Sequence, residues 1–208
     1  MSYKRTMIIS KQFIIIFSLF LASTDVSLAQ PLSLNLREVI PAVSSANDTI
    51  YYEPGDKLEW NNFKTITQPT GNVAALTASG FGFNAGMLYK NGRGSITIST
   101  YCFFSRSASW VKPGRKTDYI LAHEQHHFDI SYIGMKIFME RLEQTSFTMQ
   151  NYSALLNKIY NESYKYMSDL QNQYDAETKN GQLPDRQAAW INSIDKTLNG
   201  ITANNSSR

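Results

Sequence analysis

The chain changes character near residue 115, where short strand-like segments give way to long helical ones. Before that point, runs containing Thr, Ile, Tyr and Phe alternate with turn residues such as Pro54-Gly55-Asp56. After it, apolar residues recur at helical spacing in three stretches. Strands followed by helices favour an α+β fold, so we expect a small, mainly antiparallel sheet and then three helices.

The first half of the chain predicts one hairpin with shorter strands around it. A glycine-containing run at 74–89 and a Thr- and Ile-containing run at Ser95–Phe104 flank Asn91-Gly92. An Asn-Gly pair favours a tight turn between antiparallel strands. Shorter segments are expected at Thr49–Tyr52 and Leu58–Phe63.

The second half predicts three helices. They are expected from residue 117 or 118 to about 144, from 151 or 153 to about 178, and from 184 to a polar tail at 199–208. Gly181 stands where a helix end commonly takes a left-handed residue. Because the tail is polar, we expect it to fray.

The first thirty residues have the pattern of a secretion signal. Basic residues precede the apolar run Phe13–Ala22, and Ser27-Leu28-Ala29 offers a small-x-small cleavage site. The apolar run is too short for a permanent membrane span, which needs ~20 residues. We expect a signal peptide at 1–29 that is cleaved after Ala29, a secreted or periplasmic protein, and no membrane association after cleavage.

The remaining residues divide into an N-terminal extension at 30–48, one domain at 49–198 and the tail at 199–208. Without the first 29 residues, 17 basic side chains stand against 16 acidic ones, so no nucleic-acid partner is expected. The single cysteine, Cys102, excludes an intramolecular disulfide framework and a zinc finger of the Cys₄ or Cys₂His₂ type.

All three histidines lie in His123-Glu124-Gln125-His126-His127, which is the pattern H-E-x-x-H. On a helix, positions i and i+4 project from one face, so His123 and His127 can bind one Zn²⁺. Glu124 then lies beside the metal and can take a proton from the attacking water. His126, at i+3 from His123, is the second choice as a ligand and is expected to lie behind the site or on the surface.

A catalytic zinc usually takes three protein ligands, and no further histidine is present to supply the third. That ligand is therefore a carboxylate or, as an outsider, Cys102. The carboxylates of the second predicted helix stay open at this point: Glu162, Asp169, Asp175 and Glu177.

Five segments carry a resemblance to a known family: Leu58–Phe63, Ala78–Gly82, Ser109-Trp110, Leu121–Ile130 and Tyr174–Gly181. In their order and spacing the chain resembles a bacterial family of predicted secreted zinc-dependent proteases, catalogued as the domain of unknown function DUF922. The resemblance covers roughly residues 49 to 190.

The resemblance implies a zincin-like fold, with His123 and His127 as zinc ligands and Glu124 as general base and acid. It also favours Asp175 over Glu177 as the third ligand. The chain departs from the family's pattern at two positions: Asn62 stands where Asp is usual, and Asn180 stands where His is usual.

The resulting expectation is an exported zinc-dependent peptidase that acts on a peptide or protein. Two alternatives remain: a catalytically silent exported binding domain that retains the motif helix, and a zinc amide hydrolase that acts on cell-wall material. The strand at Ser95–Thr100 is expected at a sheet edge beside the motif helix, where an extended peptide can add to it.

Overall fold

The computed structural model describes residues 30–41, 48–65 and 71–206, and the predicted signal peptide at 1–29 lies outside them. The α+β class is confirmed, because strands come first and three helices follow. No helix in the described ranges is long and apolar enough to cross a membrane. The elements, in chain order, are β1 (Leu32–Glu38), β2 (Thr49–Tyr51), the 3₁₀ helix η1 (Trp60–Asn62), β3 (Ala75–Leu76), β4 (Ser79–Lys90), β5 (Arg93–Ser105), β6 (Trp110–Val111), α1 (Asp118–Glu143), α2 (Tyr152–Thr178) and α3 (Pro184–Ser206).

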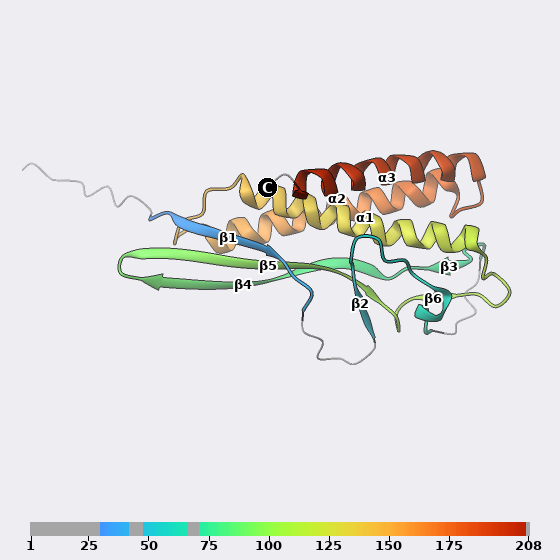
Figure 1. Ribbon diagram of the computed structural model, residues 1–208, viewed down its shortest axis with the longest axis horizontal. Helices are drawn as coiled ribbons and strands as arrows, with labels where there is room; N and C mark the ends of the chain where they lie inside the picture. Colours follow the sequence, from blue (N-terminus) through green and yellow to red (C-terminus); the bar gives the residue numbers. More distant parts are fainter. Residues whose placement is uncertain (1–29, 42–47, 66–70, 207–208) are drawn as a thin grey trace, which may run out of the picture.

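Strand β5 is the centre of the main sheet (Figure 1). One of its edges pairs with β4 in an antiparallel hairpin, which turns at Asn91-Gly92 as the sequence predicts. Both turn residues have positive φ, 52° and 74°, as a hairpin turn of the I′ type requires. The other edge pairs first with β1, in parallel, and then with β2, in the antiparallel sense.

The expectation that Ser95–Thr100 forms a sheet edge is wrong. These residues of β5 pair with β4 on one side and with β1 on the other, so neither edge is free to receive a peptide. The prediction failed because it did not include β1: the sequence pattern placed residues 30–48 in an extension rather than in the sheet. The predicted tail at 199–208 also differs from the expectation that it frays, since α3 continues through residues 199–206.

The three helices lie on one face of the sheet (Figure 1). Helix α1 contacts β4 and β5 as well as α2 and α3, so it lies between the sheet and the other two helices. Alternate residues of β5 form the buried face beneath it: Ile96, Ile98, Thr100, Cys102 and Phe104. This face and the apolar residues of α1 form one hydrophobic core.

Helix α1 begins where the sequence predicts, because the Thr117 side chain accepts a hydrogen bond from the Ile120 backbone N–H. From His123 to Met135 every residue is buried. A helix that is enclosed on all sides is usually apolar all round, but the first turns of this stretch are polar. Their side chains must therefore find partners on each neighbouring element.

Close approach of α1 and α2 requires a residue without a side chain at Gly134. A Cβ at this position would lie 2.7 Å from Met167 Cβ and 3.3 Å from a ring carbon of Phe81. By contrast, a Cβ at Gly200 in α3 would meet no atom within 4 Å. Substitution by alanine therefore adds overpacking to the gain in helix propensity at Gly134, whereas at Gly200 it brings the gain in helix propensity alone.

We predict that Gly134→Ala lowers the free energy of unfolding by about 1–2 kcal/mol, because overpacking outweighs the gain in helix propensity. The matched control Gly200→Ala should raise it by about 0.5–1 kcal/mol. Urea unfolding followed by circular dichroism measures both changes. Equal stabilisation by the two substitutions would contradict the described packing of α1 against α2.

Candidate metal centre

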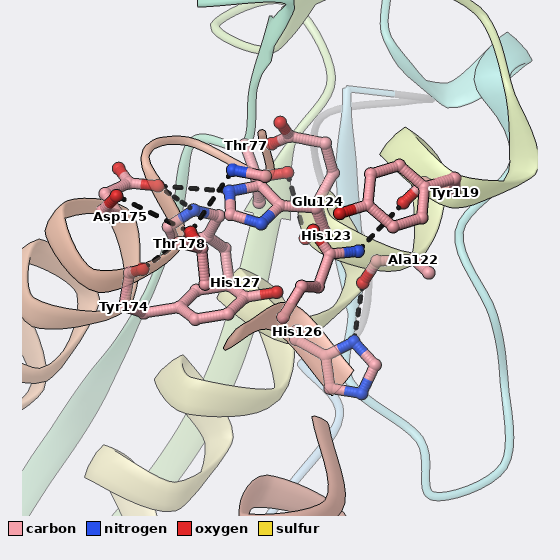
Figure 2. A network of polar contacts seen from close by, with 12 residues as sticks. Thr77, Tyr119, Ala122, His123, Glu124, His126, His127, Tyr174, Asp175 and Thr178 are labelled. Atoms are coloured by element: carbon pink, nitrogen blue, oxygen red, sulfur yellow. Dashed lines mark hydrogen bonds and ion pairs between the residues drawn. The ribbon is translucent and has the colours of Figure 1, made fainter. Parts of the chain in front are cut away.

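The two outer histidines of the motif lie one turn apart on α1 and point the same way (Figure 2). His123 and His127 are only 4% and 7% exposed, and their ring centroids lie 4.9 Å apart. The Nε2 atom of His123 lies 3.1 Å from Asp175 Oδ1, and that of His127 lies 3.0 Å from the same oxygen. Asp175, 52 and 48 positions after the two histidines, therefore converges with them on one point.

Asp175 comes from the last turn of α2. Its neighbour Tyr174 is fully buried and stacks on the His123 ring, with ring centroids 4.5 Å apart. The same ring meets His127 edge-on at 5.1 Å and packs against Trp190 of α3. Tyr174 thus holds α2 against both imidazoles, while the side chain of Asp175 stays 39% exposed to the adjoining cavity.

These three residues fit a zinc ion. Their ligand atoms all lie within 4.8 Å of one another, and they are the one such group of His, Cys, Asp or Glu in the described part of the chain. Zinc–nitrogen bonds of about 2.0–2.1 Å in a tetrahedral site put the ligand atoms roughly 3.3 Å apart. The distances of 3.0 and 3.1 Å around Asp175 Oδ1 are close to that value.

Glu124 lines the same cavity, which has a volume of ≈ 230 Å³ and is also lined by Val73–Thr77. The carboxylate is 3% exposed, and Oε2 has no hydrogen-bond partner among the described residues. Burial raises the pKa of Glu124 above its ordinary value, although the charges of His127 and His123 oppose the shift. A carboxylate with a raised pKa accepts a proton more readily than an ordinary one, and this one lies beside a candidate metal site.

Charge and burial also shift the pKa values of the converging residues. Burial lowers the pKa of His127, but the hydrogen bond to Asp175, the charges of Glu124 and Asp175, and a contact with Gln171 raise it overall. Burial of Asp175 raises its pKa, but hydrogen bonds to both histidines outweigh that effect and hold it well below its ordinary value. The Asp175 carboxylate is therefore charged throughout the neutral range.

The other carboxylates considered as third ligands lie away from this point. Glu177 accepts hydrogen bonds from Trp190 Nε1 and Gln173 Nε2, both at 2.8 Å, on the exposed side of α2. Glu162 and Asp169 are exposed and pair with lysines one turn away. Cys102 is buried in β5 and does not belong to the converging group.

His126 points away from the cavity (Figure 2). Its Nδ1 N–H donates to the carbonyl of Ala122, and its Nε2 lies 3.5 Å from Asp195 of α3 and 3.9 Å from Asp129. This side chain links α1 to α3. The arrangement agrees with the expected place of His126 behind the site.

The two departures from the family pattern have different surroundings. Asn62 Oδ1 accepts a hydrogen bond from the Glu59 N–H at 2.7 Å, so it closes the 3₁₀ turn η1. Asn180 lines the cavity beside Gly181, and both have positive φ. Only the second departure therefore lies where a change can alter the site.

A second group of polar side chains, Gln125, Asp129 and Tyr52, joins α1 to the first half of the chain. Gln125 accepts a hydrogen bond from the Leu58 N–H and donates to Asp129, which is fully buried and also accepts from Tyr52. The sequence did not predict this role, although Gln125 and Asp129 both lie in the segment Leu121–Ile130. Its partners come from a loop some 70 residues earlier in the chain.

Comparisons with known proteins found no relatives. No protein-family model matches the chain, and searches of curated proteins and of solved structures returned no match. The resemblance to the secreted zinc-dependent proteases therefore stays a prediction from the segments quoted above.

We predict that Asp175→Asn changes how the stability of the metal-free protein depends on pH. The lowered pKa of Asp175 stabilises the folded state above its ordinary value of 3.8, and this stabilisation is lost as pH falls through the folded value. The raised pKa of His127 stabilises it below 6.5, and this is lost as pH rises through the folded value.

The difference in unfolding free energy between the wild type and Asp175→Asn should therefore be largest between pH 3.8 and 6.5 and should shrink on both sides. Urea unfolding in the presence of EDTA from pH 3 to 9 measures this difference. A difference that does not vary with pH would contradict the charged contact between Asp175 and the histidines.

Proposed function

We propose that this protein is an exported zinc-dependent peptidase. The observation that carries the proposal is the convergence of His123, His127 and Asp175 beside the buried carboxylate of Glu124 in one cavity. This set supplies both a three-ligand metal site and a general base, which are the parts that metal-assisted hydrolysis of an amide needs.

In this proposal His123 Nε2, His127 Nε2 and Asp175 Oδ1 hold the metal. When bound there, zinc supplies a Lewis acid that polarises the scissile carbonyl and makes water more acidic. Tyr174 keeps both imidazoles in position by stacking on one and packing edge-on against the other. Asp175 contributes the negative charge that offsets part of the charge of the metal.

Glu124 has the role of moving the proton. Its raised pKa lets it accept a proton from the attacking water and return it to the leaving amine. Thr77 Oγ1 donates to the Glu124 backbone carbonyl at 3.1 Å, which ties this part of α1 to the segment after β3. That contact holds Glu124 next to Thr77, which lines the same cavity.

The wall formed by Val73–Thr77 supports a peptide as the substrate. Strand β3 in this segment pairs with β6, and the same segment borders the cavity that contains the converging residues. An extended peptide laid along this backbone can hydrogen-bond to it and present one amide to Glu124. Segment Val73–Thr77 thus takes the place that the sequence analysis gave to Ser95–Thr100.

Export completes the proposal. The pattern of basic residues, apolar run and small-x-small site at 1–29 supports secretion or transfer to the periplasm. The described domain is nearly neutral in charge after this segment, which agrees with a protein substrate rather than a nucleic acid.

We predict that Glu124→Gln retains zinc and lowers kcat for a cleaved peptide about 10²–10⁴-fold, because the general base is lost while the ligands remain. The matched control Glu140→Gln changes an exposed carboxylate on the same helix and should leave kcat unchanged. Activity is measured on three substrate classes: unfolded proteins, a mixed peptide library and peptidoglycan fragments. Zinc content is measured by elemental analysis.

Cleavage confined to the peptidoglycan fragments would replace the peptidase with an amide hydrolase of the cell wall. Equal peptide cleavage by the wild type and Glu124→Gln would contradict the role of Glu124. Zinc-loaded protein without activity on any of the three substrate classes would favour the catalytically silent binding domain.

A further inference from the structure

A second cavity lies next to the one that contains the candidate metal centre. Its volume is ≈ 340 Å³, and both cavities are lined by Val73 and Ala74. They also share the turn after α2, because Asn180 and Gly181 line the first cavity and Gln182 lines the second. The two spaces therefore follow each other between the same two segments of the chain, so a long substrate bound in the first can extend into the second.

The second cavity carries two cations, Lys112 and Arg115, and none of its lining residues is acidic. Both cations belong to the loop between β6 and α1, at the end of the molecule where β3 lies (Figure 1). Among the described residues, neither has a carboxylate of the protein within 4.0 Å. Their charges are therefore available to a carboxylate from outside the chain.

Two contacts fix Lys112 beside the segment that both cavities share. Its backbone N–H donates to the Ala74 carbonyl at 2.9 Å, which extends the pairing of β3 with β6 by one residue. Its Nζ donates to the Gly71 carbonyl at 2.6 Å. An ammonium group has three N–H donors, so two remain for a ligand after this contact.

The chain from Ala74 to Thr77 connects these cations to the candidate metal centre. At one end, Thr77 Oγ1 donates to the backbone carbonyl of Glu124, and at the other, Ala74 accepts the bond from Lys112. Three residues of extended backbone span about 10 Å. A peptide laid along this segment with one amide at Glu124 therefore brings a residue about three to five positions away to Lys112 and Arg115.

We propose that Lys112 and Arg115 form a subsite that binds a carboxylate of the peptide substrate, about three to five residues from the cleaved amide. This inference rests on the proposed function and deepens it, because it gives the substrate a carboxylate at a defined distance. The carboxylate belongs to an Asp or Glu side chain or to the C-terminus of the peptide. Lysine and arginine bind such a group through charge-assisted hydrogen bonds.

The test uses a peptide series in which one Glu, one Gln or one Lys occupies each position in turn, with an amidated C-terminus. A fourth member carries Gln and a free C-terminal carboxylate. Cleavage by the wild type is measured as kcat/KM, and binding to zinc-loaded Glu124→Gln is measured by fluorescence anisotropy of rhodamine-labelled peptides.

Both measurements should favour Glu over Gln by about 3–10-fold at a position about three to five residues from the cleaved amide. The preference should shrink as the salt concentration rises, because the two cations lie near the surface. A preference for the free C-terminal carboxylate alone would support the subsite and identify the C-terminus as the source of the carboxylate.

Charge reversal separates a specific subsite from a general effect of charge. Arg115→Glu should abolish the preference for Glu, because the new carboxylate neutralises Lys112. Lys116→Glu is the matched control, since it changes the net charge equally in the same loop but at a residue that does not line the cavity. This control should keep the preference, and urea unfolding of both variants measures whether the fold is retained.

The outcomes keep the two proposals apart. If peptides are cleaved equally well with Glu or Gln at every position and a free C-terminus adds nothing, only the inference falls. If no peptide is cleaved but those with the carboxylate bind more tightly and lose this advantage in Arg115→Glu, the subsite stands and the peptidase falls. An equal loss of preference in Lys116→Glu and Arg115→Glu would overturn the subsite. Neither binding nor cleavage of any peptide would overturn both proposals.

Discussion

The burial of a polar run in the middle of α1 is the constraint on which the rest of the structure depends. Residues His123–Asp129 include five polar or ionisable side chains in a row, and all are nearly inaccessible to water. Burying such groups costs free energy unless each finds a partner. The partners come from every side: Leu58 and Tyr52 from the first half, Asp175 from α2 and Asp195 from α3. The fold can be understood as the set of elements that supplies them.

Most of these partners join α1 to a neighbouring element, and one group lies beside a cavity. In the Gln125–Asp129–Tyr52 chain, both Gln125 and Tyr52 donate to Asp129 Oδ1, at 2.9 Å each. The group around His123 and His127 is different, because two imidazoles share one carboxylate oxygen and face a cavity. Natural interiors keep few unsatisfied polar atoms, so such a concentration of them marks a site that accommodates something more.

The sequence predicted the elements that depend on local pattern. Thr117 caps α1, Asn91-Gly92 turns the hairpin, and the motif spacing places His123 and His127 on one face. It did not predict β1, since a parallel partner some 60 residues away leaves no local signature. The choice of Asp175 over Glu177 came from the resemblance. Two helical residues that are two positions apart project to different sides, and periodicity alone does not say which side meets α1.

The central claim is that His123, His127 and Asp175 bind one zinc ion. The most direct measurement is the metal content of the purified protein from Gln30 to Arg208, beside a variant that carries both His123→Ala and His127→Ala. The account predicts close to one zinc per chain in the wild type and none in a variant that remains folded by circular dichroism. A wild type that stays free of zinc after incubation with excess metal would contradict it.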